Sequence, residues 1–272
     1  MTSFIVSPAT TPLIGIANVP GDKSVGHRSL LFGAIAEGKT VIRGLSGGQD
    51  NQRTRGAMAA MGVDIEELPS GQLAVQGVGL RGLKKAGQAI ECGNSGTTMR
   101  LLCGLLCAQS FDSIMVGDHS LTGRPMRRVT DPLSEMGARI EGAPGKRDGE
   151  YYPPLTIRGL GDGRLSGIRY QQPVASAQVK SALLLAGLYA DGVTEVIEPG
   201  RSRNHTELML SHMGAPLTVD GRVIRVDPTG WDGKLAGGKV SVPGDPSSAA
   251  FLIAAGLVAG VERLSVPEVC VN

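Results

Sequence analysis

The phrases "AMGVDI" (residues 60–65), "EMGARI" (135–140) and "HMGAPL" (212–217) decide how this chain folds, because they are one phrase written three times. Each phrase ends a helix-like stretch with Met-Gly and places an apolar residue three positions after the glycine. The methionines are 75 and 77 residues apart. Near-constant spacing of this kind marks a repeated supersecondary unit, so we expect three copies of one unit.

An apolar helix-like stretch lies upstream of each phrase, and a hydroxyl residue marks its opening: Ser24, Thr97 and Ser176. Each stretch is followed by a β-branched run, a more polar helix and one or two short strands. The unit therefore reads helix, strand, helix, strand, strand. The first helix of each unit is apolar nearly all round, which predicts burial. The second helices carry charged or polar residues: Arg53 and Arg55, Asp131 and Glu135, or His205 and Glu207.

A fourth unit begins at "PGDPSSAAF" (243–251), which restates "PGDKSVGHR" (20–28), and the sequence ends at Asn272. Its helix opens at Ser247 and Ser248. One helix and one strand cannot bury their own apolar face. We therefore expect that another polypeptide, or a longer natural chain, covers the apolar side chains of this helix: Phe251, Leu252, Ile253 and Leu257.

Composition favours a globular protein with a small partner. The chain has 272 residues, of which 41% are hydrophobic, enough for a full-sized core. Its 27 Lys and Arg nearly balance 25 Asp and Glu, and aromatics reach only 3%, which gives no reason to expect nucleic acid or a membrane surface as partner. No apolar run reaches the length of a membrane span.

The cysteine pattern predicts a reducing, cytoplasmic location. The four cysteines form no CxxC pair, and the N-terminus does not read as a signal or transit peptide. Cys103 and Cys107 could share a helix face, but they lack nearby His or carboxylate partners. We expect them to be buried core residues, and we predict no metal site.

Two cations lie where a helix ordinarily disfavours them. Lys23 and Arg28 fall in or beside the first turns of a helix, where unpaired N–H groups and a partial positive charge gather. The arrangement becomes favourable when a phosphate or carboxylate is bound there. The alternative is that both side chains simply extend into solvent.

Similar features recur further along the chain. "GNSGTTMR" (93–100) offers Asn94 as an amide donor and Gly96 for close approach of an anion, although a plain tight turn reads the same way. "LTGRPMRR" (121–128) offers Arg124, whose planar fork suits phosphate or carboxylate. For the next two arginines we favour a solvated basic turn: Arg127 and Arg128.

The third unit adds Ser176 and Gln178 at a helix opening, with Arg203 and His205 downstream. Ordinary helix capping is the alternative for these residues. Taken together, the cations, hydroxyls and helix N-termini predict a pocket for a ligand with several negative charges. The sequence has no Ser-His-Asp order, zinc-ligand spacing or P-loop, so binding groups are clearer than acid-base groups.

The sequence resembles the 5-enolpyruvylshikimate-3-phosphate synthase family, in its bacterial class II form, over essentially the whole chain. Five phrases carry the resemblance, in this order and spacing: "PGDKSVGHR", "GNSGTTMR", "LTGRPMRR", "ASAQVKSALLLAGL" and "PGDPSSAAF". It implies an α/β (α+β) fold of two similar domains, each a threefold repeat of β-α-β-α-β-β units around buried parallel helices, with the active site between them. By this analogy, residues 1–20 belong with the second domain, 21–241 form a complete first domain, and 242–272 are the truncated start of the second.

The resemblance also implies an activity: transfer of the carboxyvinyl group of phosphoenolpyruvate to the 5-hydroxyl of shikimate 3-phosphate, with release of phosphate and no cofactor. Lys23 would be catalytic. The residues implied to bind shikimate 3-phosphate are Lys23, Ser24, Arg28, Ser176, Ala177, Gln178 and Arg203. Those implied to bind phosphoenolpyruvate are Lys23, Asn94, Gly96, Arg124 and Gln178. Glycine at position 96 predicts that glyphosate inhibits the complete enzyme.

The family's acid-base residues lie in the second domain, so the resemblance implies that this chain alone does not turn over. A polypeptide carrying the missing part of that domain is then an expected partner. The alternative is a stand-alone phosphoshikimate-binding module without catalysis. An uncovered apolar helix in the fourth unit would favour the first interpretation, because an independent module has no reason to keep one. A purely structural repeat protein would not need these cations at equivalent helix openings.

Overall fold

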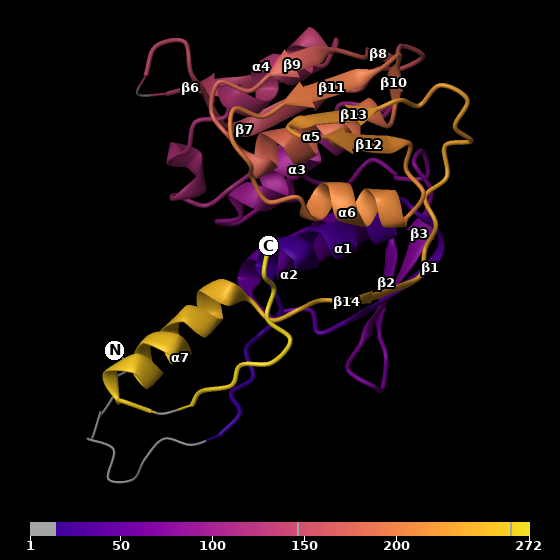
Figure 1. Cartoon of the computed structure of the whole chain (residues 1–272). Coiled ribbons are helices and arrows are strands. Elements are labelled where there is room, and N and C mark those ends of the chain that lie inside the picture. Colours follow the sequence, from indigo (N-terminus) through magenta and orange to yellow (C-terminus); the bar gives the residue numbers. More distant parts are fainter. Residues whose placement is uncertain (1–14, 146, 262) are drawn as a thin grey trace.

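The structure of the chain is a computed structural model that describes residues 15–145, 147–261 and 263–272. Its helices lie between and beside several small sheets (Figure 1). The described helices are α1 (Lys23–Ile35), α2 (Gln49–Ala60), α3 (Gly96–Leu106), the 3₁₀ turn η1 (Leu121–Gly123), α4 (Arg127–Glu135), α5 (Ala177–Gly187), α6 (His205–His212) and α7 (Pro246–Val258). None of these helices is long and apolar enough to cross a membrane.

Three four-stranded sheets share one pairing pattern among the described residues: the first two strands in the order are parallel, and the other neighbours are antiparallel. The first sheet has the order β14 (Lys239–Ser241), β1 (Glu37–Arg43), β3 (Leu73–Val78), β2 (Asp64–Glu67). The second has the order β4 (Ile90–Glu91), β5 (Ser113–Val116), β7 (Tyr151–Arg158), β6 (Arg139–Pro144).

The third sheet has the order β9 (Arg169–Gln171), β11 (Thr194–Ile197), β13 (Val223–Val226), β12 (Leu217–Asp220). A short parallel ladder joins β8 (Leu165–Ser166) to β10 (Ala190–Asp191). Along the chain, β4 and β5 flank α3 in the second sheet, β9 and β11 flank α5 in the third, and β1 follows α1 in the first.

The three apolar helices form the core, as their composition predicts. α1 is buried from Val25 to Ile35, and most of α3 and α5 is buried as well. α3 packs against α5 so closely that a Cβ on Gly104 would lie 2.1 Å from the carbonyl oxygen of Ala182. Only glycine allows two helix backbones to approach this way. Cys103 and Cys107 lie fully buried in this core, as predicted.

The three Met-Gly phrases end α2, α4 and α6. Met61, Met136 and Met213 are the C-cap residues, and their side chains are buried. Each following glycine has a positive φ, between 87° and 98°, which is the left-handed conformation that stops a helix. The repeated phrase is therefore a helix-stop signal with an apolar anchor.

The predicted helix openings are only partly right. Ser176 does cap α5, but α1 is capped by Asp22 and α3 by Ser95, each two residues before the hydroxyl residue named above. α7 is capped by Asp245, which accepts the N–H groups of Ser247 and Ser248. A carboxylate caps a helix as well as a hydroxyl does, and in these two "PGD" phrases it comes first along the chain.

The two "PGD" phrases lie side by side. Asp22 N–H donates to the Pro243 carbonyl at 2.7 Å, and Asp245 N–H donates to the Pro20 carbonyl at 2.8 Å. Beyond this crossing, α7 extends away from the sheets, and the segment after it runs back to place the C-terminus beside α1 and the start of α6 (Figure 1). Of the proposed segment 1–20, residues 1–14 lie outside the described residues.

Candidate functional site

A cavity of about 590 Å³ opens where the N-terminal ends of α1 and α5 meet the segment before α6. Its lining contains all seven residues that the resemblance assigns to shikimate 3-phosphate: Lys23, Ser24, Arg28, Ser176, Ala177, Gln178 and Arg203. Further lining comes from Thr97, Ala175, Arg201, Ser202 and His205. Residues from three units of the chain thus converge on one cavity that is rich in cations and hydroxyls.

Arg28 is a buried part of this site. Only 3% of it is exposed, so the alternative that it extends into solvent is wrong. Its guanidinium donates to Thr206 Oγ1 at 2.6 Å, to Ser181 Oγ at 2.7 Å and to the Ser24 carbonyl at 2.9 Å. Burial lowers the pKa of Arg28 to about 10, so it keeps its charge at neutral pH. Three bonds leave two of its five N–H groups free for a ligand.

Arg203 stands at the open side of the cavity. Its Nη1 donates to Ser24 Oγ at 3.0 Å, and the residue is exposed. Arg201 and Ser202 reach the same cavity from the same segment. An exposed guanidinium fork with one bond made can still bind a phosphate with two parallel N–H groups.

Ser176 has the capping role that the alternative interpretation gave it. Its Oγ accepts the Val179 N–H at 3.4 Å, and its own N–H donates to Gln172 Oε1 at 3.2 Å. A hydroxyl oxygen has a second lone pair and a proton to donate, so capping and ligand binding are compatible. The unpaired N–H groups at this helix start face the same cavity as Ser176.

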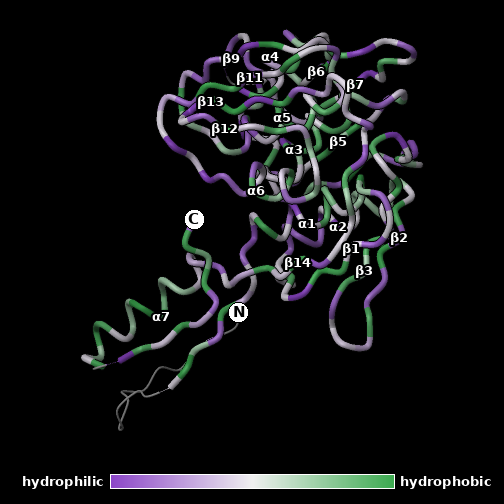
Figure 2. Tube along the Cα trace, turned by 45° about the vertical axis from the view of Figure 1, so that its right-hand side comes forward, coloured by the Kyte–Doolittle hydropathy of each residue, from purple (hydrophilic) through white to green (hydrophobic). Residues whose placement is uncertain are grey.

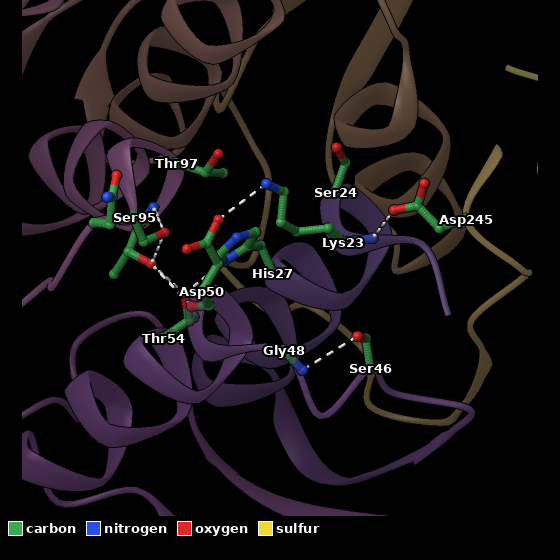
Figure 3. A network of polar contacts seen from close by, with 12 residues as sticks. Lys23, Ser24, His27, Ser46, Gly48, Asp50, Thr54, Ser95, Thr97 and Asp245 are labelled. Atoms are coloured by element: carbon green, nitrogen blue, oxygen red, sulfur yellow. Dashed lines mark hydrogen bonds and ion pairs between the residues drawn. The ribbon is translucent and has the colours of Figure 1, made fainter. Parts of the chain in front are cut away.

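Lys23 is exposed and sits between two carboxylates (Figure 3). Its Nζ lies 3.0 Å from Asp50 Oδ2, and its backbone N–H donates to Asp245 Oδ2 at 3.2 Å. Asp50, in the first turn of α2, was not predicted as part of the site from the sequence. Because the Lys23–Asp50 pair is solvent-exposed, it contributes little to stability and leaves the ammonium available for an anion.

The three remaining predicted residues gather beside the cavity and not in its lining. Arg124 donates to Asn94 Oδ1 and, at 3.3 Å, to Ser120 Oγ. A Cβ on Gly96 would lie 3.3 Å from Arg124 Nη1. Asn94, Gly96 and Arg124 therefore form a second cationic cluster next to the first.

Arg100 joins the two clusters and was missed in the sequence. Its Nη1 donates to Gln178 Oε1 at 3.0 Å, while Gln178 Nε2 donates to Thr97 Oγ1 at 3.0 Å. Burial lowers the pKa of Arg100 to about 10. The available signal was a cation inside the apolar helix "GTTMRLLCGLL", which must find a polar partner if it is buried.

Arg127 and Arg128 do not line the cavity. The predicted basic turn is the start of α4, and of the two side chains only that of Arg128 is exposed. Arg127 is half-buried: its Nε donates to Asp131 Oδ1 at 3.0 Å, and its guanidinium carbon lies 5.0 Å from the centre of the Tyr151 ring.

A buried ionic cluster lies next to the cavity and contacts its lining through Ser202. Lys180 is fully buried, with its Nζ 2.9 Å from Glu198 Oε2 and 2.5 Å from Glu207 Oε1. Ser202, a cavity residue, donates its hydroxyl to Glu198 Oε1. His205 and Glu207, the polar residues named for the second helix of the third unit, are both buried, and Glu207 is paired with Lys180.

His27 belongs to the network of polar side chains around Lys23 and Asp50 (Figure 3). Its Nδ1 is 2.7 Å from Thr54 Oγ1, and its Nε2 is buried without a partner among the described residues. Burial lowers the pKa of His27 from 6.5 to about 3. The folded chain therefore keeps this imidazole neutral where the unfolded chain takes up a proton.

A pH-dependent loss of stability follows from His27. Below pH 6.5, His27 takes up a proton in the unfolded chain but not in the folded chain. The free energy of unfolding therefore decreases as the pH falls from 6.5 toward about 3. We expect about 2 kcal/mol less unfolding free energy from this residue at pH 5 than at pH 7. Urea unfolding of the wild type and of His27→Gln at both pH values isolates the effect. Equal losses in the two proteins would refute it.

Sequence similarity to known proteins shows which family the chain belongs to. Residues 8–272 match the sequence model of a family described as EPSP synthase (3-phosphoshikimate 1-carboxyvinyltransferase). The chain belongs to the EPSP synthase family. This family is that of a shikimate-pathway transferase.

Individual relatives agree with the family match. The 3-phosphoshikimate 1-carboxyvinyltransferase of Brevibacillus brevis is 50% identical over 258 residues, which are 95% of this chain and 58% of the relative. That of Alkalilimnicola ehrlichii is 50% identical over 260 residues, 96% of this chain and 56% of the relative. The chain thus spans less than two thirds of the length of these EPSP synthase family members.

A solved structure shows the same fold. The structure of EPSP synthase from Acinetobacter baumannii is 46% identical, with a TM-score of 0.85, and the match covers 95% of this chain and 57% of that one. The mixed α/β architecture described above is therefore the EPSP synthase fold.

Proposed function

We propose that this chain supplies the shikimate 3-phosphate-binding half of an EPSP synthase site. One observation carries the proposal: the seven residues assigned by resemblance line one cavity at the starts of α1 and α5. The cavity combines guanidinium and ammonium groups with hydroxyls and helix N-termini, a combination that suits a phosphate together with a carboxylate. In the complete enzyme, the carboxyvinyl group of phosphoenolpyruvate would be transferred to the 5-hydroxyl of this ligand, and phosphate would be released.

We assign the ligand groups by the chemistry of the lining. Arg203, Ser176 and the Ala177 backbone hold the phosphate, because a planar fork, a hydroxyl and a helix start meet there. Arg28 and Ser24 hold the carboxylate and a ring hydroxyl, since Arg28 is buried, charged and fixed by three hydrogen bonds. Gln178 packs against the ring, and its amide is fixed by Arg100 and Thr97.

Phosphoenolpyruvate is proposed to bind at the neighbouring cluster of Asn94, Gly96 and Arg124, within reach of Lys23. Lys23 would act as the catalytic cation that stabilises charge during addition and elimination. Its exposed ammonium supports this role, because an anion can displace Asp50 from it at little cost. The proposed mechanism needs no cofactor.

Replacing Gly96 by alanine tests the placement of phosphoenolpyruvate. The new methyl would lie 2.7 Å from Arg100 Nη1 and 3.3 Å from Arg124 Nη1, so both guanidinium groups must move. They are ends of flexible side chains, so we expect the unfolding free energy to change by less than about 1 kcal/mol. In the complete enzyme, we expect glyphosate to inhibit at roughly tenfold higher concentration, because the inhibitor meets displaced cations.

The measurement for Gly96→Ala is glyphosate inhibition of phosphate release, with shikimate 3-phosphate affinity as the internal control. Gly96 does not line the cavity at the starts of α1 and α5, so the affinity for shikimate 3-phosphate should stay within about threefold of the wild type. An unchanged half-inhibitory glyphosate concentration would contradict the placement.

We propose that the chain alone does not complete the reaction. It spans 58% of the Brevibacillus brevis relative, and among the described residues the lining of its cavity offers cations, hydroxyls, an amide and the imidazole of His205, but no carboxylate. The exposed apolar face of α7 supports this interpretation over a stand-alone binding module. Phe251 is 80% exposed and Leu257 is 78% exposed, and the helix lies apart from the core (Figure 2).

The test is phosphate release from phosphoenolpyruvate and shikimate 3-phosphate. The chain is assayed alone and mixed with the remaining part of the Brevibacillus brevis relative, after sedimentation has shown that the two associate. We expect release by the mixture and by neither part alone. Release by the pure chain would contradict the half-site proposal, and a silent mixture would contradict the activity.

The domain organisation is proposed on the same basis. The shared pairing pattern of the three sheets supports a threefold β-α-β-α-β-β repeat over residues 21–241. The pairing of the two "PGD" phrases supports crossings near residues 20 and 242, where the chain passes between two pseudo-equivalent domains. The free cysteines support a reducing, cytoplasmic location.

A further inference from the structure

Three side chains of types that ligate metals meet next to the cavity, although they come from distant parts of the chain. Asp22 is the N-cap of α1, His205 is the first residue of α6, and Cys270 lies in the C-terminal segment. Their ligand atoms all lie within 4.8 Å of one another. Asp22 and His205 are each 5% exposed, and Cys270 is half-buried.

Backbone contacts hold these residues in place without any help from a ligand. Asp22 N–H donates to the Pro243 carbonyl at 2.7 Å, and Cys270 N–H donates to the Gly244 carbonyl at 2.9 Å. The C-terminal segment is tied to the start of α6 by Asn272, whose Oδ1 accepts the Asn204 N–H at 3.3 Å and whose amide donates to Asn204 Oδ1. The cluster is therefore preorganised, which reduces the entropy lost on binding.

The donor atoms suit a divalent transition metal ion. A carboxylate oxygen, an imidazole nitrogen and a thiolate sulfur are the three ligand types of Zn²⁺, whereas Mg²⁺ and Ca²⁺ prefer oxygen alone. Three protein ligands leave one coordination position open, as in catalytic zinc sites. One carboxylate and one thiolate also cancel the charge of the ion, so the neighbouring Arg28 faces a neutral complex.

Cys270 is the cysteine that can supply the thiolate ligand, because it is half-buried and its sulfur lies within 4.8 Å of the ligand atoms of Asp22 and His205. The other three cysteines do not compete for the ion, because Cys92, Cys103 and Cys107 are fully buried and burial raises the pKa of each thiol.

We propose that Asp22, His205 and Cys270 form a binding site for Zn²⁺ or a similar divalent transition metal ion. The bound ion ties the C-terminal segment to the starts of α1 and α6. Because His205 also lines the ligand cavity, the ion lies next to that cavity. The site is independent of the proposed function, and its test uses no shikimate compound.

The test is titration of the whole chain, with Zn²⁺ followed by calorimetry and with Co²⁺ followed by absorbance. We expect one ion per chain and, for Co²⁺, a sulfur-to-metal charge-transfer band. Cys270→Ser should remove the band, and Cys270→Ser and His205→Gln should each weaken Zn²⁺ binding at least roughly tenfold. Asp22→Asn keeps an N-cap of equal quality, so its weaker binding would report the lost carboxylate ligand. The matched control is His212→Gln, an exposed histidine at the other end of α6, which should bind like the wild type.

A second measurement needs no variant. Cys270 is the accessible thiol among the four, so a thiol reagent should modify one cysteine in the folded chain, and Zn²⁺ should protect it. The proposal is overturned if the wild type shows no saturable binding, if Cys270→Ser and His205→Gln bind as tightly as the wild type, or if saturating Zn²⁺ leaves the rate of thiol modification unchanged.

Discussion

Arg203→Ala is expected to weaken the binding of shikimate 3-phosphate to this chain by roughly 30- to 150-fold, or about 2 to 3 kcal/mol. Arg203 brings a guanidinium charge to the open side of the cavity, and a charge-assisted bond to phosphate is among the stronger single contacts in a site. The side chain is exposed and bonds to Ser24 Oγ, so its loss should not disturb folding. Calorimetric titration measures the change.

The control for this experiment is Arg164→Ala. Arg164 is also an exposed arginine with one partner, since its Nη1 lies 3.0 Å from Asp191 Oδ1, but it is not part of the cavity lining. We expect this variant to bind shikimate 3-phosphate like the wild type. An affinity loss of less than about threefold in Arg203→Ala would remove Arg203 from the phosphate site.

Lys180→Met is expected to lower the unfolding free energy of the chain by about 3 to 5 kcal/mol. Methionine fills much of the same volume, but it leaves the carboxylates of Glu198 and Glu207 buried without their cation. Glu207 Oε2 already has no partner among the described residues, so Lys180 is its main source of compensation. Urea unfolding at neutral pH measures the loss.

A triple variant separates the charge effect from packing. Lys180→Met combined with Glu198→Gln and Glu207→Gln removes all three charges and keeps similar shapes, so it should recover much of the lost stability. If Lys180→Met alone stays within about 1 kcal/mol of the wild type, the cluster does not stabilise the fold as described.

The parts of the fold that were predictable from sequence are those set by local patterns. The Met-Gly phrases end α2, α4 and α6 because glycine can adopt the positive φ that stops a helix without a steric penalty. The apolar helices are buried because no face of them is polar. The helix openings were harder, because "PGDKS" offers both Asp22 and Ser24 as caps and the sequence alone does not rank them.

The parts that escaped prediction depend on tertiary contacts. Lys180 is a single cation inside "AQVKSALLLAG", and its partners are Glu198, just after β11, and Glu207 on α6. Nothing in the local spacing connects them. Arg100 is similar, since its partner Gln178 belongs to the neighbouring unit. In both cases the informative signal was a charge within an apolar helix, which must be paired if it is buried.

The resemblance was most useful where local signals were weak. Each of the sites around Lys23, Asn94, Arg124 and Arg203 reads alone as a turn, a cap or a solvated cation. The fold brings the first and last of these to one cavity and the other two to a cluster beside it. The two groups are separate because of how the segments that carry them are arranged in the fold. Sequence spacing alone does not predict that arrangement.

The central claim is that this cavity binds shikimate 3-phosphate, and calorimetric titration of the purified chain tests it most directly. Shikimate without its phosphate serves as the matched ligand. We predict saturable binding of one shikimate 3-phosphate per chain and at least roughly tenfold weaker binding of shikimate, because the cations around Arg203 would lose their strongest partner. The absence of shikimate 3-phosphate binding, or equal affinity for the two ligands, would contradict the account.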